Sequence, residues 1–190
     1  MAEADRVLGM YLHLARASKL RQQPLVRAKL LVLAGVQAEA MGLDEISALC
    51  RHRILSQNPR HLVRRWPTMQ DALAAEPFQT HLKQLRRRYS HEKVEHMMHS
   101  LGIEMGQERA AYFSDTEYAA ALLNTRVEAI GEILSQAPEH EARLASAPAP
   151  PGSPLFKAPK MRDVLVVWAP FVAGLLLLAA LAIASRSIQQ

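Results

Sequence analysis

An uncharged apolar run near the C-terminus is the strongest constraint on what this 190-residue chain can form. From Val164 to Ala184 the sequence is VLVVWAPFVAGLLLLAALAIA, twenty-one residues without a formal charge. As a helix this run is about 31 Å long, which matches the hydrocarbon thickness of a bilayer. The alternative is a buried core helix, but core helices seldom run this long without a charge. We therefore predict one transmembrane helix over 163–185 and a short C-terminal tail over 186–190.

The residues on either side of this run indicate its orientation. Three basic residues precede it and one follows it, and Lys and Arg are retained on the cytoplasmic side of a membrane. The start of the chain lacks the apolar stretch of a signal peptide. We therefore expect a tail-anchored, single-pass membrane protein with a cytoplasmic N-terminal domain. The predicted membrane-flanking residues are Lys157, Lys160, Arg162, Trp168 and Arg186.

Composition places the rest of the chain in the all-α class. Gly is sparse and β-branched residues are few outside the apolar run, so strand signals are weak. Cys50 is the one cysteine, which excludes an intrachain disulfide and fits a reducing cytoplasm. Arg outnumbers Lys by 17 to 6 and Ala is abundant, as in GC-rich bacterial genomes. We therefore expect a protein of a bacterial inner membrane.

Helical periodicity divides residues 1–136 into several amphipathic segments and one apolar segment. The run Leu30–Val36 is apolar on all sides and predicts a central core helix. Residues 137–162 are rich in Pro and Ala and predict a linker, or else a ligand for an aromatic-lined groove. The helices are predicted at 3–20, 24–42, 44–57, 60–66, 69–75, 77–88, 91–101 and 115–136.

One pair of these predicted helices carries a known spacing. Gly35 and Pro59 lie where the tetratricopeptide repeat has its helix-packing glycine and its closing proline, and residues 28–61 resemble one such unit. Ala38 departs from the pattern at the usual aromatic position, and Met69 stands where a second repeat would need glycine. The resemblance implies an α-hairpin architecture for this pair alone.

Charge is segregated along the chain. Residues 51–88 hold nine Lys or Arg and two acidic residues, a net charge of +7, whereas residues 89–136 have a net charge of −5. The two oppositely charged segments would pair with each other, either inside the domain or between copies of it. Alternatively, the basic segment would form a solvated face. A basic face would alternatively bind anionic lipid or nucleic acid. The predicted basic-surface residues are Arg51, Arg53, Arg60, Arg64, Arg65, Arg86, Arg87 and Arg88.

The segment SHEKVEHMMHS combines carboxylates with imidazoles at helical spacing. Glu92, Glu95, His96 and His99 would share one helix face, where such ligands hold divalent metals if a facing helix adds more. The alternative is a solvent-exposed face with i,i+4 pairs, because the apolar residues occupy the opposite side. These four residues are the candidate metal ligands. His91 and His96 are five residues apart and do not meet the HExxH spacing of zinc proteases.

No catalytic motif and no cofactor-binding motif is recognisable in the sequence. Cys50 lies with apolar neighbours on its predicted helix, which indicates a buried structural thiol. We therefore predict a non-enzymatic protein that presents a helical interaction or scaffold domain at the membrane, for a protein partner or for self-association. The alternative is a membrane-tethered binder of nucleic acid or anionic lipid through 51–88. A metal-dependent enzyme on the helix 91–101 is the third hypothesis.

Overall fold

The computed structural model describes residues 3–104 and 108–146. Amphipathic and apolar helices make up this part of the chain. The described residues contain helices and no strand, which confirms the all-α prediction. The helices are α1 (Glu3–Leu20), α2 (Pro24–Ala40), α3 (Asp44–Gln57), η1 (Leu62–Arg65), α4 (Met69–Ala74), α5 (Glu76–Arg88), α6 (His91–Ser100), η2 (Glu108–Ala111), α7 (Asp115–Leu122) and α8 (Val127–Ser146).

The predicted transmembrane helix and tail lie outside the described residues, as does most of the predicted linker. Within 3–104 and 108–146, no helix has the length and apolar character needed to cross a bilayer.

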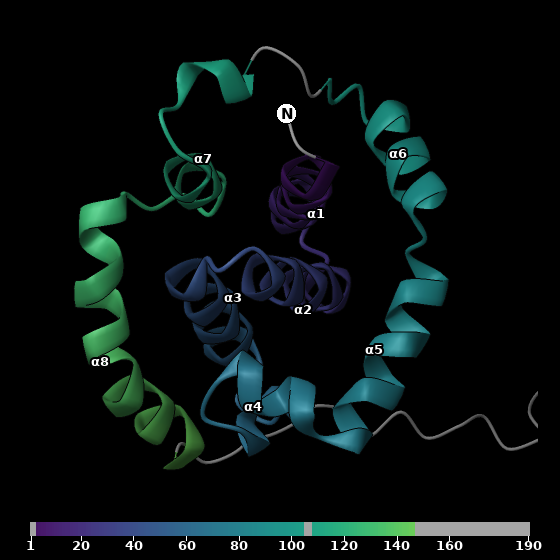
Figure 1. Cartoon of the computed structure of the whole chain (residues 1–190). Helices are drawn as coiled ribbons and strands as arrows, with labels where there is room; N and C mark the ends of the chain where they lie inside the picture. Colours follow the sequence, from purple (N-terminus) through teal and green to yellow (C-terminus); the bar gives the residue numbers. More distant parts are fainter. Residues whose placement is uncertain (1–2, 105–107, 147–190) are drawn as a thin grey trace, which may run out of the picture. The chain divides into compact units, whose positions relative to one another are not determined.

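Helix α2 is the central element of the fold. Its residues Leu30 to Val36 are all buried, and none of their apolar side chains is more than 5% exposed. An apolar surface on all sides of a helix can be buried only by neighbours on all sides. Helices α1, α3, α4 and α5 supply these neighbours, which confirms the predicted core helix (Figure 1).

Helices α1, α2 and α3 form two successive antiparallel hairpins. The Gln37 amide in the last turns of α2 donates to the carbonyl of Ala4 at the start of α1, 3.4 Å away. At Gly35 the backbone of α2 comes close to its neighbours. A Cβ built on this residue would lie 2.9 Å from Met69 Cε and 3.3 Å from Cys50 Cβ. The α-hairpin expected for residues 28–61 is therefore present, with the glycine at its helix contact.

The hairpin turns share one hydrogen-bond pattern, the Schellman motif. At the end of α1, the Gln23 amide donates to the Ser18 carbonyl (2.9 Å) and the Gln22 amide to the Lys19 carbonyl (3.1 Å). Gln22 has a φ of 54°, a left-handed conformation that glycine adopts most easily. Gly42 holds the equivalent place after α2.

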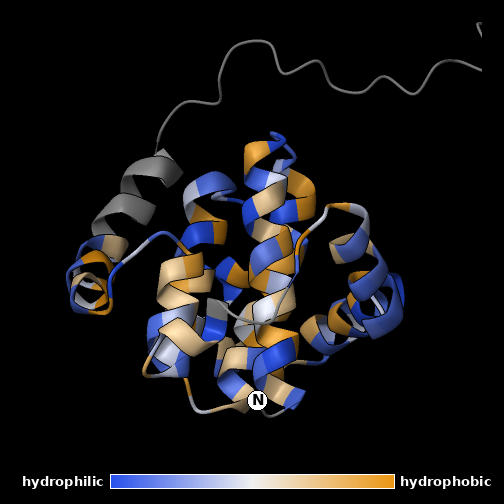
Figure 2. Ribbon diagram, turned by 90° about the horizontal axis from the view of Figure 1, so that it is seen from above, coloured by the Kyte–Doolittle hydropathy of each residue, from blue (hydrophilic) through white to orange (hydrophobic). Residues whose placement is uncertain are grey.

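The remaining helices flank this three-helix unit. In Figure 1, α5 and α6 lie on one side and α8 on the opposite side, with α4 between them. The stripe Phe78, Leu82, Leu85 and Tyr89 of α5 is buried, as its spacing predicts. Figure 2 shows hydrophilic residues on the outer side of α5 and α6. These helices therefore cover the core with one face and present a charged face to solvent.

The single helix predicted over 115–136 is wrong. The structure divides it into α7 and α8 at Asn124, which has a φ of 59°. The amides of Asn124 and Thr125 donate back to the last turn of α7, which ends that helix. Helix α8 then continues to Ser146 with Pro138 inside it, ten residues into the segment predicted as linker.

Candidate interaction surfaces

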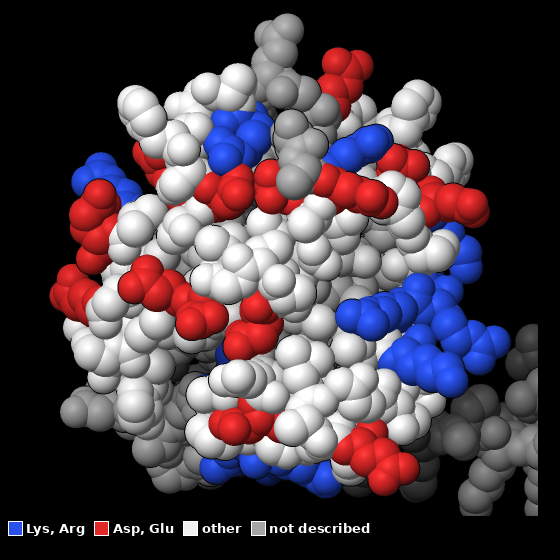
Figure 3. Space-filling model, in the orientation of Figure 1, with Lys and Arg blue, Asp and Glu red and all other residues white. Residues whose placement is uncertain are grey.

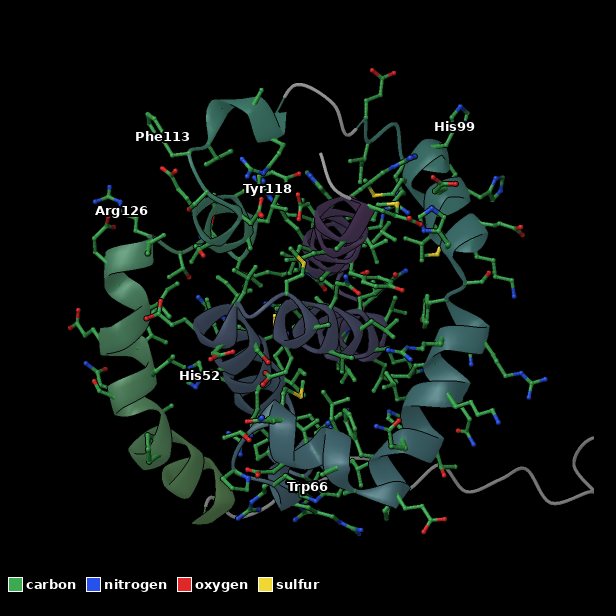
Figure 4. The ribbon with its side chains drawn as sticks, viewed as in Figure 1. His52, Trp66, His99, Phe113, Tyr118 and Arg126 are labelled. Carbon is green, nitrogen blue, oxygen red and sulfur yellow. The ribbon has the colours of Figure 1, made fainter. Side chains whose placement is uncertain are left out.

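A groove lies between α3, the start of α4 and the second half of α8. We call it the α3–α8 groove; its volume is about 550 Å³, within the range of small-molecule and side-chain pockets. Figure 4 shows His52 between α3 and α8. The described lining residues are Glu39, Asp44, Ser47, Ala48, Arg51, His52, Pro67, Thr68, Met69, Gln70, Leu134, Ala137 and Pro138.

Two polar side chains of this groove bond within the fold, and one buried hydroxyl in its lining is unpaired in the residues that the structure describes. The Arg51 Nε donates to the Trp66 carbonyl at 3.1 Å, and His52 Nε2 lies 3.3 Å from the Ser56 hydroxyl. Ser47 is only 1% exposed, and its hydroxyl has no hydrogen-bond partner among the described residues. A ligand that brings a polar atom into the groove would satisfy this hydroxyl, because an unpaired buried hydroxyl costs free energy.

Two of the predicted basic-surface residues belong to internal contacts instead. Arg51 bonds to the backbone beside η1, as described above. The Arg53 Nη2 donates to Thr125 Oγ1 at 2.8 Å, which ties α3 to the turn between α7 and α8. Arg53 Nε is buried and has no acceptor within the described part of the chain. The segment 51–88 is therefore not one continuous binding surface.

Arg27 and Arg53 form a pair of like charges around Cys50. Arg27 is only 9% exposed, and burial, followed by the charge of Arg53, lowers the pKa of its guanidinium. Cys50 is fully buried, and burial raises the pKa of its thiol to about 12, although both arginines act to lower it. The prediction of a buried structural thiol is confirmed, since the thiolate is the reactive form.

The other predicted basic residues are exposed, and they lie on two elements. Arg60, Arg64 and Arg65 belong to the loop around η1, and Arg86 to Arg88 end α5. At about 100° per residue, Lys83 and Arg87 face outward from the buried stripe, and Arg86 and Arg88 lie on its two flanks. Lys83, Arg86 and Arg87 border a shallow hollow with Gln79, Thr80 and Leu82. Figure 3 shows basic side chains gathered over α5.

The candidate metal ligands lie on the outer face of α6. Glu92, His96 and His99 are exposed, whereas Val94 and Met98 on the opposite side are buried. Glu95 is engaged by Arg6 of α1 at 2.5 Å and by His91 at 3.3 Å. In the described segments, no group of three or more His, Cys, Asp or Glu residues is placed to hold a metal ion.

A buried polar cluster between α1 and α7 was not predicted from the sequence. His13 is 7% exposed, and its Nε2 lies 2.8 Å from the Tyr118 hydroxyl. Arg109 stacks on the Tyr118 ring, 5.8 Å from its centroid, and pairs with Asp115. His13 and Tyr118 are 105 positions apart along the chain, so no local sequence spacing predicts their contact.

The groove residues were missed for the same reason. They come from four separate segments, and Ser47, Met69 and Leu134 each look like ordinary helix positions in the sequence. The predicted membrane-flanking residues, Lys157 to Arg186, lie outside the described residues.

No model of a protein family matches this chain, and neither a curated protein nor a solved structure matches it.

Proposed function

We propose that this protein is a single-pass, tail-anchored membrane protein whose cytoplasmic helical domain binds a protein partner. The uncharged run Val164–Ala184 supports the anchor, because twenty-one apolar residues suffice to span the hydrocarbon core. The α3–α8 groove is the observation that carries the binding role. It combines an apolar floor with one unpaired buried hydroxyl, at Ser47.

The walls of the groove favour a peptide side chain as the ligand. Ala48, Met69, Leu134 and Ala137 offer apolar contact, and acidic groups from Glu39 and Asp44 border it. Protein interfaces gain most of their affinity where an apolar anchor residue fills such a pocket inside a polar rim. An apolar anchor fits this lining, and a basic flanking residue would suit the side bordered by Glu39 and Asp44, away from Arg51.

The anchor is tested by flotation of the full chain with lipid vesicles. The wild-type chain should float with vesicles and resist carbonate extraction, and a chain lacking 164–184 should stay in the soluble fraction. Protease added to sealed inverted membranes should digest the helical domain, since it lies on the cytoplasmic side. A full-length chain that stays soluble without detergent would exclude this function.

The groove is tested by photo-crosslinking from the native membrane. A photoreactive residue at Ala48 should give a discrete crosslinked product, and the same residue at Thr80, exposed on α5, serves as the matched control. Leu134→Glu places a charge in the groove and should remove the product at Ala48. Equal products from both positions, or a product that survives Leu134→Glu, would exclude the groove as the binding site.

A second candidate function is polyanion binding by the outer face of α5. Lys83, Arg86 and Arg87 are exposed, and none of them makes an ion pair in the part of the chain that the structure describes. Nucleic acid bound through phosphate contacts loses affinity steeply with salt. The pair Arg86→Glu and Arg87→Glu should weaken binding and flatten its salt dependence, whereas Arg126→Glu, exposed at the start of α8, should not.

A further inference from the structure

The three-helix unit is charged oppositely at its two ends. Because α1, α2 and α3 are antiparallel, the start of α1, the end of α2 and the start of α3 lie together. We call this the acidic end; its residues are Glu3, Asp5, Glu39, Asp44 and Glu45. The opposite end, which we call the basic end, carries Arg16, Lys19, Arg21, Arg27 and Arg53.

Acidic residues in these helices are confined to one end, where Arg6 is the basic exception. No Asp or Glu occurs between Arg6 and Ala38, or between Ile46 and Gln70. Figure 3 views the molecule from the end at which α1 begins, and acidic side chains are spread widely over that face. The basic end therefore lacks neutralising acids from its own three helices.

Two leucines are largely exposed to solvent at the basic end. Leu20 is 78% exposed and Leu25 is 71% exposed, and they lie on either side of the turn Arg21–Gln23. A single exposed leucine is common on a protein surface, whereas two beside one turn form a small apolar patch. We call residues 19–25 the α1–α2 tip. It places two exposed aliphatic side chains at the turn between α1 and α2.

Basic residues surround these leucines and have no counter-ion. Arg16, Lys19 and Arg21 are exposed, and none of them makes an ion pair with any described residue. Arg27, one turn into α2, is nearly buried beside Arg53, and neither has a carboxylate partner within the described segments. The positive charge of Arg16, Lys19 and Arg21 is therefore available to an anionic partner, whereas Arg27 and Arg53 are held inside the fold.

We propose that the α1–α2 tip docks on an anionic lipid surface, with Leu20 and Leu25 entering the acyl boundary and Arg16, Lys19 and Arg21 facing lipid phosphates. Apolar side chains ringed by Lys and Arg are the combination by which proteins lie on membrane interfaces. This docking rests on the proposed membrane anchor, which holds the domain beside the bilayer. The helical domain then sits on the membrane with its acidic end directed away.

Nucleic acid fits this surface less well. Phosphodiester backbones recruit arginine and lysine, but they offer nothing to two exposed aliphatic side chains. A lipid interface accepts both the cations and the leucines. The outer face of α5, which has cations but no exposed leucine, lacks this combination.

Docking is tested with the full chain reconstituted into vesicles of phosphatidylcholine, with or without phosphatidylglycerol. An environment-sensitive fluorophore is attached at Gln23→Cys in the tip or at Ala40→Cys, exposed at the acidic end of the same unit. The native Cys50 is fully buried and stays unlabelled. Emission from position 23 should shift to the blue and be quenched by brominated lipid in anionic vesicles. Emission from position 40 should do neither.

Variants of the tip separate its two components. Leu20→Ser with Leu25→Ser should abolish the lipid quenching at position 23. Each of Lys19→Gln and Arg21→Gln should lower the docked-to-undocked ratio about fivefold in anionic vesicles, the effect of losing one cation near such a surface. None of these substitutions alters the buried core. An unchanged helical circular dichroism spectrum should confirm that each variant is folded.

The outcomes distinguish this docking from the anchor itself. If the chain floats with vesicles but positions 23 and 40 respond alike, docking is excluded and the anchor stands. A response of position 23 to added DNA rather than to anionic lipid would also overturn the docking. A chain that does not float would overturn the anchor, and the docking with it.

Discussion

Replacing Gly35 with alanine should destabilise the domain, although alanine is the better helix former. The added Cβ would lie 2.9 Å from Met69 Cε, closer than real Cβ atoms come, and 3.3 Å from Cys50 Cβ, tighter than most real Cβ contacts. Met69 Cε ends a flexible side chain and can move aside, whereas Cys50 Cβ is fixed to the backbone of α3, so the contact with Cys50 carries most of the cost. Alanine in a helix interior gains roughly 0.5–1 kcal/mol over glycine, whereas overpacking a core costs about 1–3 kcal/mol. The net loss in free energy of unfolding is therefore about 1 kcal/mol, or roughly 2–4 °C in Tm.

Gly131 supplies the matched control for this substitution. It lies inside α8, it is exposed, and a Cβ there meets nothing within 4 Å. Gly131→Ala should therefore show the gain in helix propensity alone and stabilise the domain by about 0.5–1 kcal/mol. The two Gly→Ala substitutions should thus shift stability in opposite directions.

A double-mutant cycle with Met69→Ala separates the two contacts. Met69→Ala removes the Cε that the new methyl group meets, so the cost of Gly35→Ala should fall in part in that background. Thermal unfolding of the full chain in mild detergent, followed by circular dichroism, measures all four species. A stabilising Gly35→Ala would refute the close packing of α2 against α3, and strictly additive effects with Met69→Ala would refute it against α4.

Three further substitutions or conditions test local features of the fold. At pH 8 the Cys50 thiol should react with a disulfide reagent at least about a thousandfold more slowly than an exposed thiol, because burial raises its pKa from 9.0 to about 12; a rapid reaction in the native state would contradict this. Burial lowers the pKa of both His61 and His81, and His81 and Lys29 respectively lower these pKa values further. The free energy of unfolding should thus be full above pH 6.5 and fall as the pH drops below it. Urea midpoints measured across that range check the sign, and His81→Gln should be the less pH-sensitive variant. Gln22→Gly should stabilise the domain by about 0.5–1 kcal/mol by relieving its left-handed backbone, and a lower Tm would show that the Gln22 side chain contributes more than the strain costs.

Apolar periodicity predicts most of the described helices because burial decides their faces. The core helix around Leu31 and the stripe of α5 need only the sequence, since an all-apolar run or a one-sided stripe has few ways to be buried. The same signal fails at Asn124. The spacing of Leu123, Val127 and Ile130 continues across the break, while the backbone of Asn124 turns left-handed and ends α7. Periodicity reports which faces are buried, and it does not report where the axis turns.

A count of charge along the chain does not show which basic residues face solvent. Arg51 and Arg53 contribute to the +7 of residues 51–88, yet both are used in contacts inside the fold. Their acceptors, the Trp66 carbonyl and Thr125 Oγ1, lie 15 and 72 positions away. An arginine that bonds across such separations has the same local sequence as one that faces solvent, so sequence alone cannot separate them.

The charge polarity of the three-helix unit also emerges only when its turns are known, and helix stability does not explain it. Acidic residues at the start favour the dipoles of α1 and α3, and Lys19 in the last turn adds to this in α1. Helix α2 has the reverse arrangement, with Arg27 in its first turn and Glu39 in its last. Each such placement costs a helix roughly 0.3–1 kcal/mol, so α2 loses stability to keep the two ends of opposite sign. A polarity that opposes local stability favours a role for the basic end in contact with a partner outside the domain.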